Sequence, residues 1–168
     1  MGTMVLHLSE WLESTAIGVL VRESTWGFPA LVSLHVIGLA FSAGIVLWFD
    51  LRLLGLSMRR VPVSAVYRRL MPIAFAGFLV MFVSGGLLLS GFATYAYKNV
   101  YFLVKVAALL LAGVNAWVYH SFTERRIAEW DRSPTPPPPA RLAGIVSVVL
   151  WTVIILAGRM MAYTLYTR

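Results

Sequence analysis

The stretch FPALVSLHVIGLAFSAGIVLWF, residues 28–49, contains a single ionisable side chain, that of His35. A helix needs about 20 predominantly apolar residues to cross the hydrocarbon core of a bilayer, so this stretch is long enough to span it. Three further stretches meet the same criterion, residues 71–92, 100–120 and 142–163. The sequence therefore predicts an all-α integral membrane protein whose four transmembrane helices form an up-down bundle.

The composition supports this prediction and limits the chemistry. Of the 168 residues, 60% are hydrophobic and 12% are charged, and the mean hydropathy is +0.80, well above that of ordinary soluble domains. Four spans leave no room for a sizeable soluble domain, so we expect residues 1–168 to form a single membrane domain. The chain has no cysteine, which excludes disulfides, thiolate metal sites and iron–sulfur clusters. A bound metal would need His, Met, carboxylate or amine ligands.

The positions of the basic residues predict how the helices are oriented. The formal net charge is +7, and nine arginines lie between the first and second spans or between the third and fourth: Arg52, Arg59, Arg60, Arg68, Arg69, Arg125, Arg126, Arg132 and Arg141. The opposite side has Arg22, Lys98 and Arg168. By the positive-inside rule, both termini face the periplasm of a bacterial inner membrane, and the proline-rich residues 131–141 form a stiff inner loop. Because no basic patch is interleaved with exposed aromatic residues, nucleic-acid binding is not expected.

Residues 8–23, LSEWLESTAIGVLVRE, precede the first span. Apolar residues recur here at helical spacing, while Glu10, Glu13 and Arg22 lie elsewhere around the helix. We expect an amphipathic helix that lies in the membrane interface.

Helix rise places several polar and small residues at one depth. His35 in the first span and Lys105 in the third lie in one layer, about 8 to 12 Å below the outer surface at about 1.5 Å per residue. The same layer contains Gly85, Gly86, Gly158 and Arg159 from the second and fourth spans. Ionisable side chains within a membrane normally face the bundle interior and indicate function. The glycines would leave room for a flat cofactor, or would only let the helices pack closely.

Two segments of the chain resemble known families. WGFPALVSLHVIGLAFSAGIVLWFDLRLLG, residues 26–55, and FLVKVAALLLAGVNAWVYH, residues 102–120, resemble a bacterial family of small four-helix membrane proteins of unassigned function. More distantly, LHVIG in the first span and FLVK in the third are similar to the membrane domain of copper-resistance protein D and to the oxygen-independent membrane protoporphyrinogen oxidase. In that oxidase family a first-helix histidine and a third-helix lysine are the key residues, and the protein binds haem b. The resemblance implies that His35 and Lys105 have the corresponding roles here.

The leading hypothesis is a haem b protein that transfers electrons as a subunit or anchor of a larger membrane oxidoreductase. His35 would ligate the iron, and a helix carbonyl or a hydroxyl such as that of Ser33 or Ser42 would hold its other ring N–H. The second axial ligand would be Lys105, His7 or a methionine. Two further sets of residues would contact the haem: Gly85, Gly86 and Gly158 at the porphyrin plane, and the cations Arg159, Lys98 and Arg22 at the propionates.

Two alternative functions stay open. In the first, His35 together with Met81, Met160 or Met161 would bind copper(I). In the second, the chain is a cofactor-free structural accessory subunit. Whether the protein is an enzyme also stays open, because the sequence contains no nucleophile with an adjacent base and no phosphate-binding loop. Redox partner subunits, a quinone near the outer surface, and oligomers are compatible with these hypotheses.

The remaining polar residues of the spans lie near the inner ends. His120 differs in depth from His35 by about 20 Å, so the two histidines cannot share a metal. Asp50 and Arg52, at the end of the first span, are expected to form a local polar pair.

Overall fold

The structure is a computed structural model that describes residues 2–166, with side chains from 3 to 164. The described chain is helical throughout apart from short connections. Its α-helices are α1 Gly2–Ser14, α2 Ala16–Glu23, α3 Gly27–Leu39, α4 Ile45–Leu53, α5 Val63–Gly91, α6 Ala93–Lys98, α7 Val100–Val118, α8 Ile127–Trp130 and α9 Pro138–Tyr166. A π-helical segment, Ala40–Gly44, joins α3 to α4, and Tyr119–Thr123 and Glu124–Arg126 continue α7 to α8 as π- and 3₁₀-helix.

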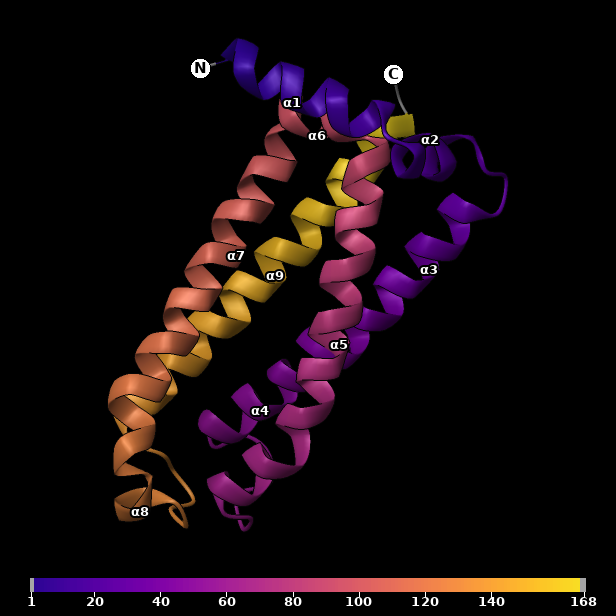
Figure 1. The fold of residues 1–168 in the computed structure, drawn as a ribbon. Helices are drawn as coiled ribbons and strands as arrows, with labels where there is room; N and C mark the ends of the chain where they lie inside the picture. Colours follow the sequence, from indigo (N-terminus) through magenta and orange to yellow (C-terminus); the bar gives the residue numbers. More distant parts are fainter. Residues whose placement is uncertain (1, 167–168) are drawn as a thin grey trace.

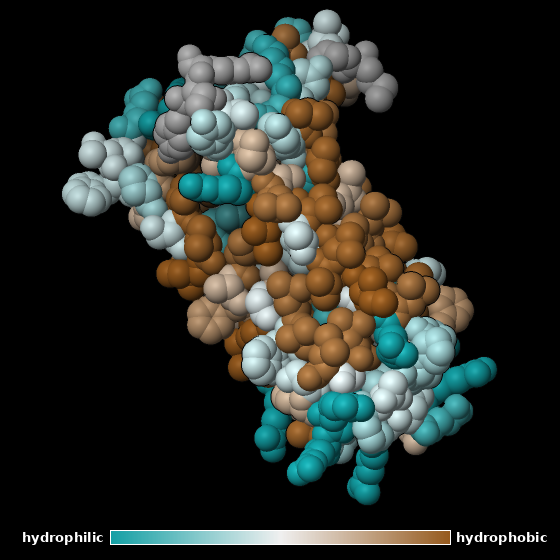
Figure 2. All heavy atoms as spheres, turned by 180° about the vertical axis from the view of Figure 1, so that it is seen from behind, coloured by the Kyte–Doolittle hydropathy of each residue, from teal (hydrophilic) through white to brown (hydrophobic). Residues whose placement is uncertain are grey.

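Four helical stretches are long and apolar enough to cross a membrane: Gly27–Leu53, Val63–Gly91, Val100–Trp130 and Pro138–Thr164. Figure 2 shows a hydrophobic band across the middle of the molecule, with hydrophilic residues gathered mainly at its two ends. The prediction of an all-α chain with four long apolar helices is therefore confirmed.

The four long helices pack as two pairs that meet at one end. The first pair is α3 and α4 with α5, and the second is α7 with α9. Helix α9 also packs against α4, which joins the pairs in the half of the bundle nearer α8 (Figure 1). At the other end α1 and α2 lie across the bundle, in contact with α6 and α5, and both ends of the chain lie on this side (Figure 1).

Glycines let α3 and α5 approach closely. A Cβ atom at Gly77 would lie 2.6 Å from the backbone of Phe41 and Ser42, and one at Gly38 would lie 2.8 Å from the backbone nitrogen of Met81. The hydroxyl of Ser42, which lies in the π-helical segment, donates to the Gly38 carbonyl at 2.7 Å. Small residues at helix contacts are a common way for membrane helices to associate. These two glycines therefore hold the first pair together.

Helix α5 begins eight residues before the predicted span, at Val63 rather than at residue 71. Asp131 from the third connection caps it. Its carboxylate accepts from the Ser64 backbone N–H at 2.7 Å and from the Ser64 hydroxyl at 2.8 Å, and its carbonyl accepts from the Val63 N–H at 3.0 Å. Caps of this kind satisfy N–H groups that have no partner within the helix.

The predicted proline-rich loop 131–141 is too long by four residues, because α9 begins at Pro138. Proline suits the first helical turn, where its missing N–H would have had no partner. Arg52 fixes the two connections at this end. Its side chain is fully buried and donates to the carbonyls of Val61 at 2.9 Å and Ser133 at 3.0 Å. The expected pair of Asp50 with Arg52 is therefore wrong, since Arg52 is bonded to loop carbonyls instead.

The predicted single helix over residues 8–23 is also corrected. The chain forms α1 and α2, which are bent by 70° relative to each other. Thr15 stands at the break, where its hydroxyl accepts from the Gly18 N–H at 3.1 Å and so caps α2. Gly18 lies against the Ser90 carbonyl, to which a Cβ atom would approach within 2.7 Å. The bend lets α2 dock on α5.

Candidate functional site

His35 on α3 is half-buried and faces α5. Its Nδ1 lies 3.1 Å from the hydroxyl oxygen of Ser84. That hydroxyl also lies 2.6 Å from the Val80 carbonyl of its own helix, to which it donates its single proton. With its proton on the Val80 carbonyl, the Ser84 hydroxyl accepts from His35, an arrangement that favours the neutral imidazole tautomer with its proton on Nδ1. The lone pair of the ring is then on Nε2, which makes no hydrogen bond to the described residues and is available to a ligand.

The sequence analysis named Ser33 and Ser42 as candidate partners of the His35 ring N–H, whereas the structure has Ser84 in this position. Ser33 donates to the Pro29 carbonyl at 2.8 Å, and Ser42 donates to Gly38. Both bonds lie within the helix that contains His35. A usable signal was present in the sequence, because Ser84 directly precedes Gly85 and so lies at the same depth as His35.

Lys105 on α7 lies against α9. A Cβ atom at Gly158 would be 3.9 Å from both the Cδ and the Nζ of Lys105. Among the side chains that the structure describes, Lys105 has no carboxylate within ion-pair distance. An amine in a membrane-spanning helix without a counter-charge is unusual and indicates function.

The structure brings four predicted residues into one layer. Gly85 lies against His35, since a Cβ atom there would be 3.0 Å from the Cε1 of the imidazole. Gly158 lies against Lys105, and Lys105 is near enough to His35 to exert an electrostatic effect on it. Each of the four spans therefore contributes one residue to this layer, and two of the four are glycines against which the polar side chains of His35 and Lys105 pack.

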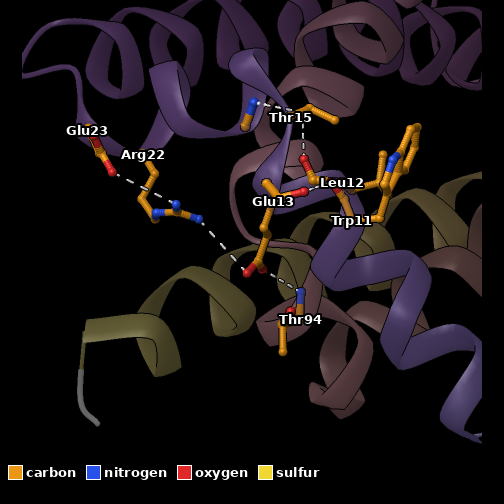
Figure 3. Close-up of polar contacts among 9 residues, drawn as sticks. Trp11, Leu12, Glu13, Thr15, Arg22, Glu23 and Thr94 are labelled. Carbon is orange, nitrogen blue, oxygen red and sulfur yellow. Dashed lines mark hydrogen bonds and ion pairs between the residues drawn. The ribbon is translucent and has the colours of Figure 1, made fainter.

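The other predicted residues are exposed or already paired. Gly86 is exposed, and a Cβ atom there would meet nothing within 4 Å, so the next residue after Gly85 points outward. Arg159 and Lys98 are exposed. Arg22 lies between two carboxylates at 4.0 Å each, those of Glu13 and Glu23 (Figure 3). Glu13 also accepts from the Thr94 N–H at 2.6 Å (Figure 3). Glu13 therefore links α1 to Arg22 of α2 and to α6.

The other predicted ligands are exposed or have contacts of their own. His7 is exposed on α1, where it lies 3.7 Å from Glu10. The sulfur of Met81 lies 3.6 Å from the hydroxyl oxygen of Ser42, and Ser42 lies two helical turns from His35 along the chain. Met160 is 39% exposed. Within residues 2–166, no group of three or more His, Cys, Asp or Glu residues is arranged to hold a metal ion.

A second polar region lies nearer α8. A cavity of about 370 Å³ is lined by residues of α4, α5, α7 and α9, including Asp50, Asn115, Tyr119 and His120. His120 is hydrogen-bonded to Glu124 and packs against Tyr119 at a ring-centroid distance of 5.3 Å. It is therefore separate from the layer of His35, as predicted. The cavity was not predicted from the sequence.

A model of a family of unknown function, DUF6644, matches residues 8–164, which is nearly the whole chain. No curated protein and no solved structure matches it. The distant resemblance to copper-resistance protein D and to the membrane protoporphyrinogen oxidase stays a prediction.

Proposed function

The chain belongs to the DUF6644 family, whose function is not known, and we propose that it binds haem b at His35 and transfers electrons in a membrane. Its helices are apolar enough for this location. The proposal depends chiefly on the bond between His35 and Ser84, because that bond leaves Nε2 of a neutral imidazole free. Metal-ligating histidines almost always donate their other ring N–H to an oxygen acceptor in this way.

Haem suits the set of side chains in this layer better than a bare metal ion does. The macrocycle supplies four nitrogens, so the protein needs to contribute only one or two axial ligands. A bare ion needs more protein ligands than His35 and Lys105 provide, and the described residues contain no three-membered group of His, Cys, Asp or Glu to supply them. When bound, haem supplies one-electron transfer.

Lys105 would be the second residue to hold the haem. A neutral amine can ligate iron, and this state also avoids an uncompensated ammonium in the membrane. Gly85 and Gly158 let the imidazole of His35 and the side chain of Lys105 lie close to the backbone of α5 and α9. Arg159 and Lys98, both exposed, are the proposed partners of the haem propionates, whereas Arg22 is already paired with Glu13 and Glu23.

The proposed orientation places both termini, α1 and α2 at the periplasmic face of a bacterial inner membrane. The exposed arginines of the opposite end, among them Arg59, Arg60, Arg125 and Arg132, then face the cytoplasm, as the positive-inside rule favours. The haem layer would lie near the periplasmic face, and a larger oxidoreductase would exchange electrons with it from that side.

The visible spectrum of the purified protein tests the proposal. We expect a Soret band and a dithionite-reduced α band, both lost in His35→Ala. Exogenous imidazole should restore them, because it can occupy the space of the removed ring. His120→Ala and His7→Ala are the matched controls and should retain the full signal, since neither residue lies in the layer.

Three results would contradict the proposal. One is a wild-type protein, monodisperse in detergent, that has no Soret band after expression with added haem precursor. Another is stoichiometric copper by metal analysis without haem bands, which would favour copper handling. The third is full haem retention in His35→Ala. For the second ligand, Lys105→Met should keep haem but shift the α band and the midpoint potential; an unchanged spectrum would exclude Lys105 as a ligand.

A further inference from the structure

The cavity near α8 opens on the side of the helix bundle, where a bilayer would surround the spans. Its volume is about 370 Å³, within the range of sites that bind small organic molecules. Phe75 and Phe82 of α5 and Gly113 and Ala116 of α7 line it and are themselves exposed. All four lie within membrane-spanning helices. A ligand would therefore enter from the bilayer, between α5 and α7.

Two buried polar atoms of the cavity residues have no hydrogen-bond partner. They are Oδ2 of Asp50 and the hydroxyl oxygen of Tyr119, and the two side chains are close enough to interact electrostatically. Buried polar groups are nearly always paired, and leaving one without a partner costs about 1 to 3 kcal/mol. Arg52, the arginine nearest to Asp50 in the sequence, does not pair with the Asp50 carboxylate, because it donates to the carbonyls of Val61 and Ser133. A ligand with hydrogen-bonding groups would satisfy both atoms.

The walls of the cavity are largely aromatic. Phe49, Tyr67, Phe78 and Trp151 line it, and the rings of Phe78 and Trp151 lie 5.6 Å apart between centroids. Aromatic rings of this kind pack favourably on a flat conjugated ring. The chemistry required of the ligand is thus a flat, lipid-soluble head with hydrogen-bonding oxygens.

We infer that this cavity binds the head group of an isoprenoid quinone or its quinol, with Tyr119 and Asp50 as its hydrogen-bonding partners. A quinone carbonyl accepts from the Tyr119 hydroxyl, and a quinol hydroxyl donates to the Asp50 carboxylate. The isoprenoid tail leaves through the opening between α5 and α7. A lipophilic organic cation fits less well, because it offers no acceptor for the Tyr119 proton. The inference concerns binding alone and does not depend on haem.

Decylubiquinone is the probe, and quenching of tryptophan fluorescence in nanodiscs is the measurement, since Trp151 lines the cavity. We expect saturable quenching by the wild-type protein. Tyr119→Phe should raise the apparent Kd for decylubiquinone about five- to tenfold, the worth of one hydrogen bond. Asp50→Asn should raise the apparent Kd for the reduced form, decylubiquinol, by the same factor in the same assay, because only the quinol has a hydroxyl to donate to the carboxylate. Tyr163→Phe, at an exposed tyrosine near the other end of α9, is the matched control and should bind as the wild type does.

A glycine pair tests the cavity without relying on polar groups. Gly113 and Gly44 are both exposed in membrane-spanning helices, and a Cβ atom at either would meet nothing within 4 Å. Only Gly113 lines the cavity. Gly113→Phe should abolish saturable quenching by filling the space, whereas Gly44→Phe should leave it unchanged.

Equal, non-saturable quenching in all variants would overturn the inference, because it would show only partition into the bilayer. Saturable binding of tetraphenylphosphonium without binding of the quinone would also overturn it, in favour of a cation site. The Soret band is recorded for every variant. Quinone binding without a Soret band would contradict the proposed haem function but not this inference. A Soret band without quinone binding would contradict this inference but not the proposed haem function.

Discussion

Nδ1 of His35 on α3 is hydrogen-bonded to the hydroxyl of Ser84 on α5 at 3.1 Å, across 49 residues of sequence. The bond joins two spans of the first helix pair and favours the imidazole tautomer with its proton on Nδ1. Because the Ser84 hydroxyl donates its proton to the Val80 carbonyl, its oxygen acts as the acceptor for His35. The ring is thereby oriented before any ligand binds, which lowers the cost of ligand binding.

Removing this acceptor should weaken the proposed haem site while His35 itself is retained. In Ser84→Ala the imidazole loses the partner that fixes its tautomer, and we expect haem affinity to fall about 10- to 100-fold. Haem content per protein and the midpoint potential measure the effect. Ser90→Ala on the same helix is the control, since the Ser90 hydroxyl bonds only to the Leu87 carbonyl. Equal haem retention in both variants would contradict this role of Ser84.

Adjacent glycines on α5 should respond differently to alanine. A Cβ atom at Gly85 would lie 3.0 Å from the Cε1 of His35, whereas one at Gly86 would meet nothing within 4 Å. In Gly85→Ala the imidazole has to move by a few tenths of an ångström, so we expect less bound haem and a shifted α band. Gly86→Ala should keep the wild-type spectrum. If both variants match the wild type, the packing of Gly85 on His35 does not matter for the site.

The cap on α5 should contribute measurably to stability. Asp131→Ala removes the carboxylate that accepts two hydrogen bonds from Ser64. We expect the free energy of unfolding to fall by about 1 to 2 kcal/mol. Thermal unfolding in detergent, followed by far-ultraviolet circular dichroism, measures the change. Glu129→Ala, at an exposed neighbour in the same connection, should unfold as the wild type does. An unchanged melting temperature in Asp131→Ala would show that the cap is dispensable.

The buried guanidinium of Arg52 should matter more than any exposed arginine at the same end. Arg52→Met leaves the carbonyls of Val61 and Ser133 without their donor, and we expect a loss of about 2 kcal/mol in unfolding free energy. Proteolysis of the 131–137 connection should also become faster, because Arg52 holds it in place. Arg60→Met, at an exposed position, is the control and should change neither quantity. Similar values for the two variants would count against a structural role of Arg52.

The sequence by itself determined the number of long apolar helices and their approximate positions. Apolar length is a property of each segment alone, so no tertiary contact was needed to find it. The common depth of His35, Lys105, Gly85 and Gly158 followed equally from helix rise. The antiparallel order of the spans then placed the four residues in one layer.

The ends of the helices depended on residues distant in the chain. Helix α5 begins at Val63 because Asp131, from the connection two spans later, satisfies its first N–H groups. Arg68 and Arg69 suggested a loop before the second span, yet both lie in this helix. The pattern of a single segment does not contain such a cap.

Tertiary structure alone decided which way each side chain points. Successive residues of a helix differ in direction by about 100°, and spans that are apolar on every side give no pattern that fixes their rotation. Gly85 and Gly86 therefore looked equivalent, and Ser84 was overlooked in favour of Ser33 and Ser42. Asp50 and Arg52 were paired although residues two apart on a helix do not face each other. Helix packing fixed these rotations, and with them the contact of His35 with Ser84 and the cavity at Tyr119.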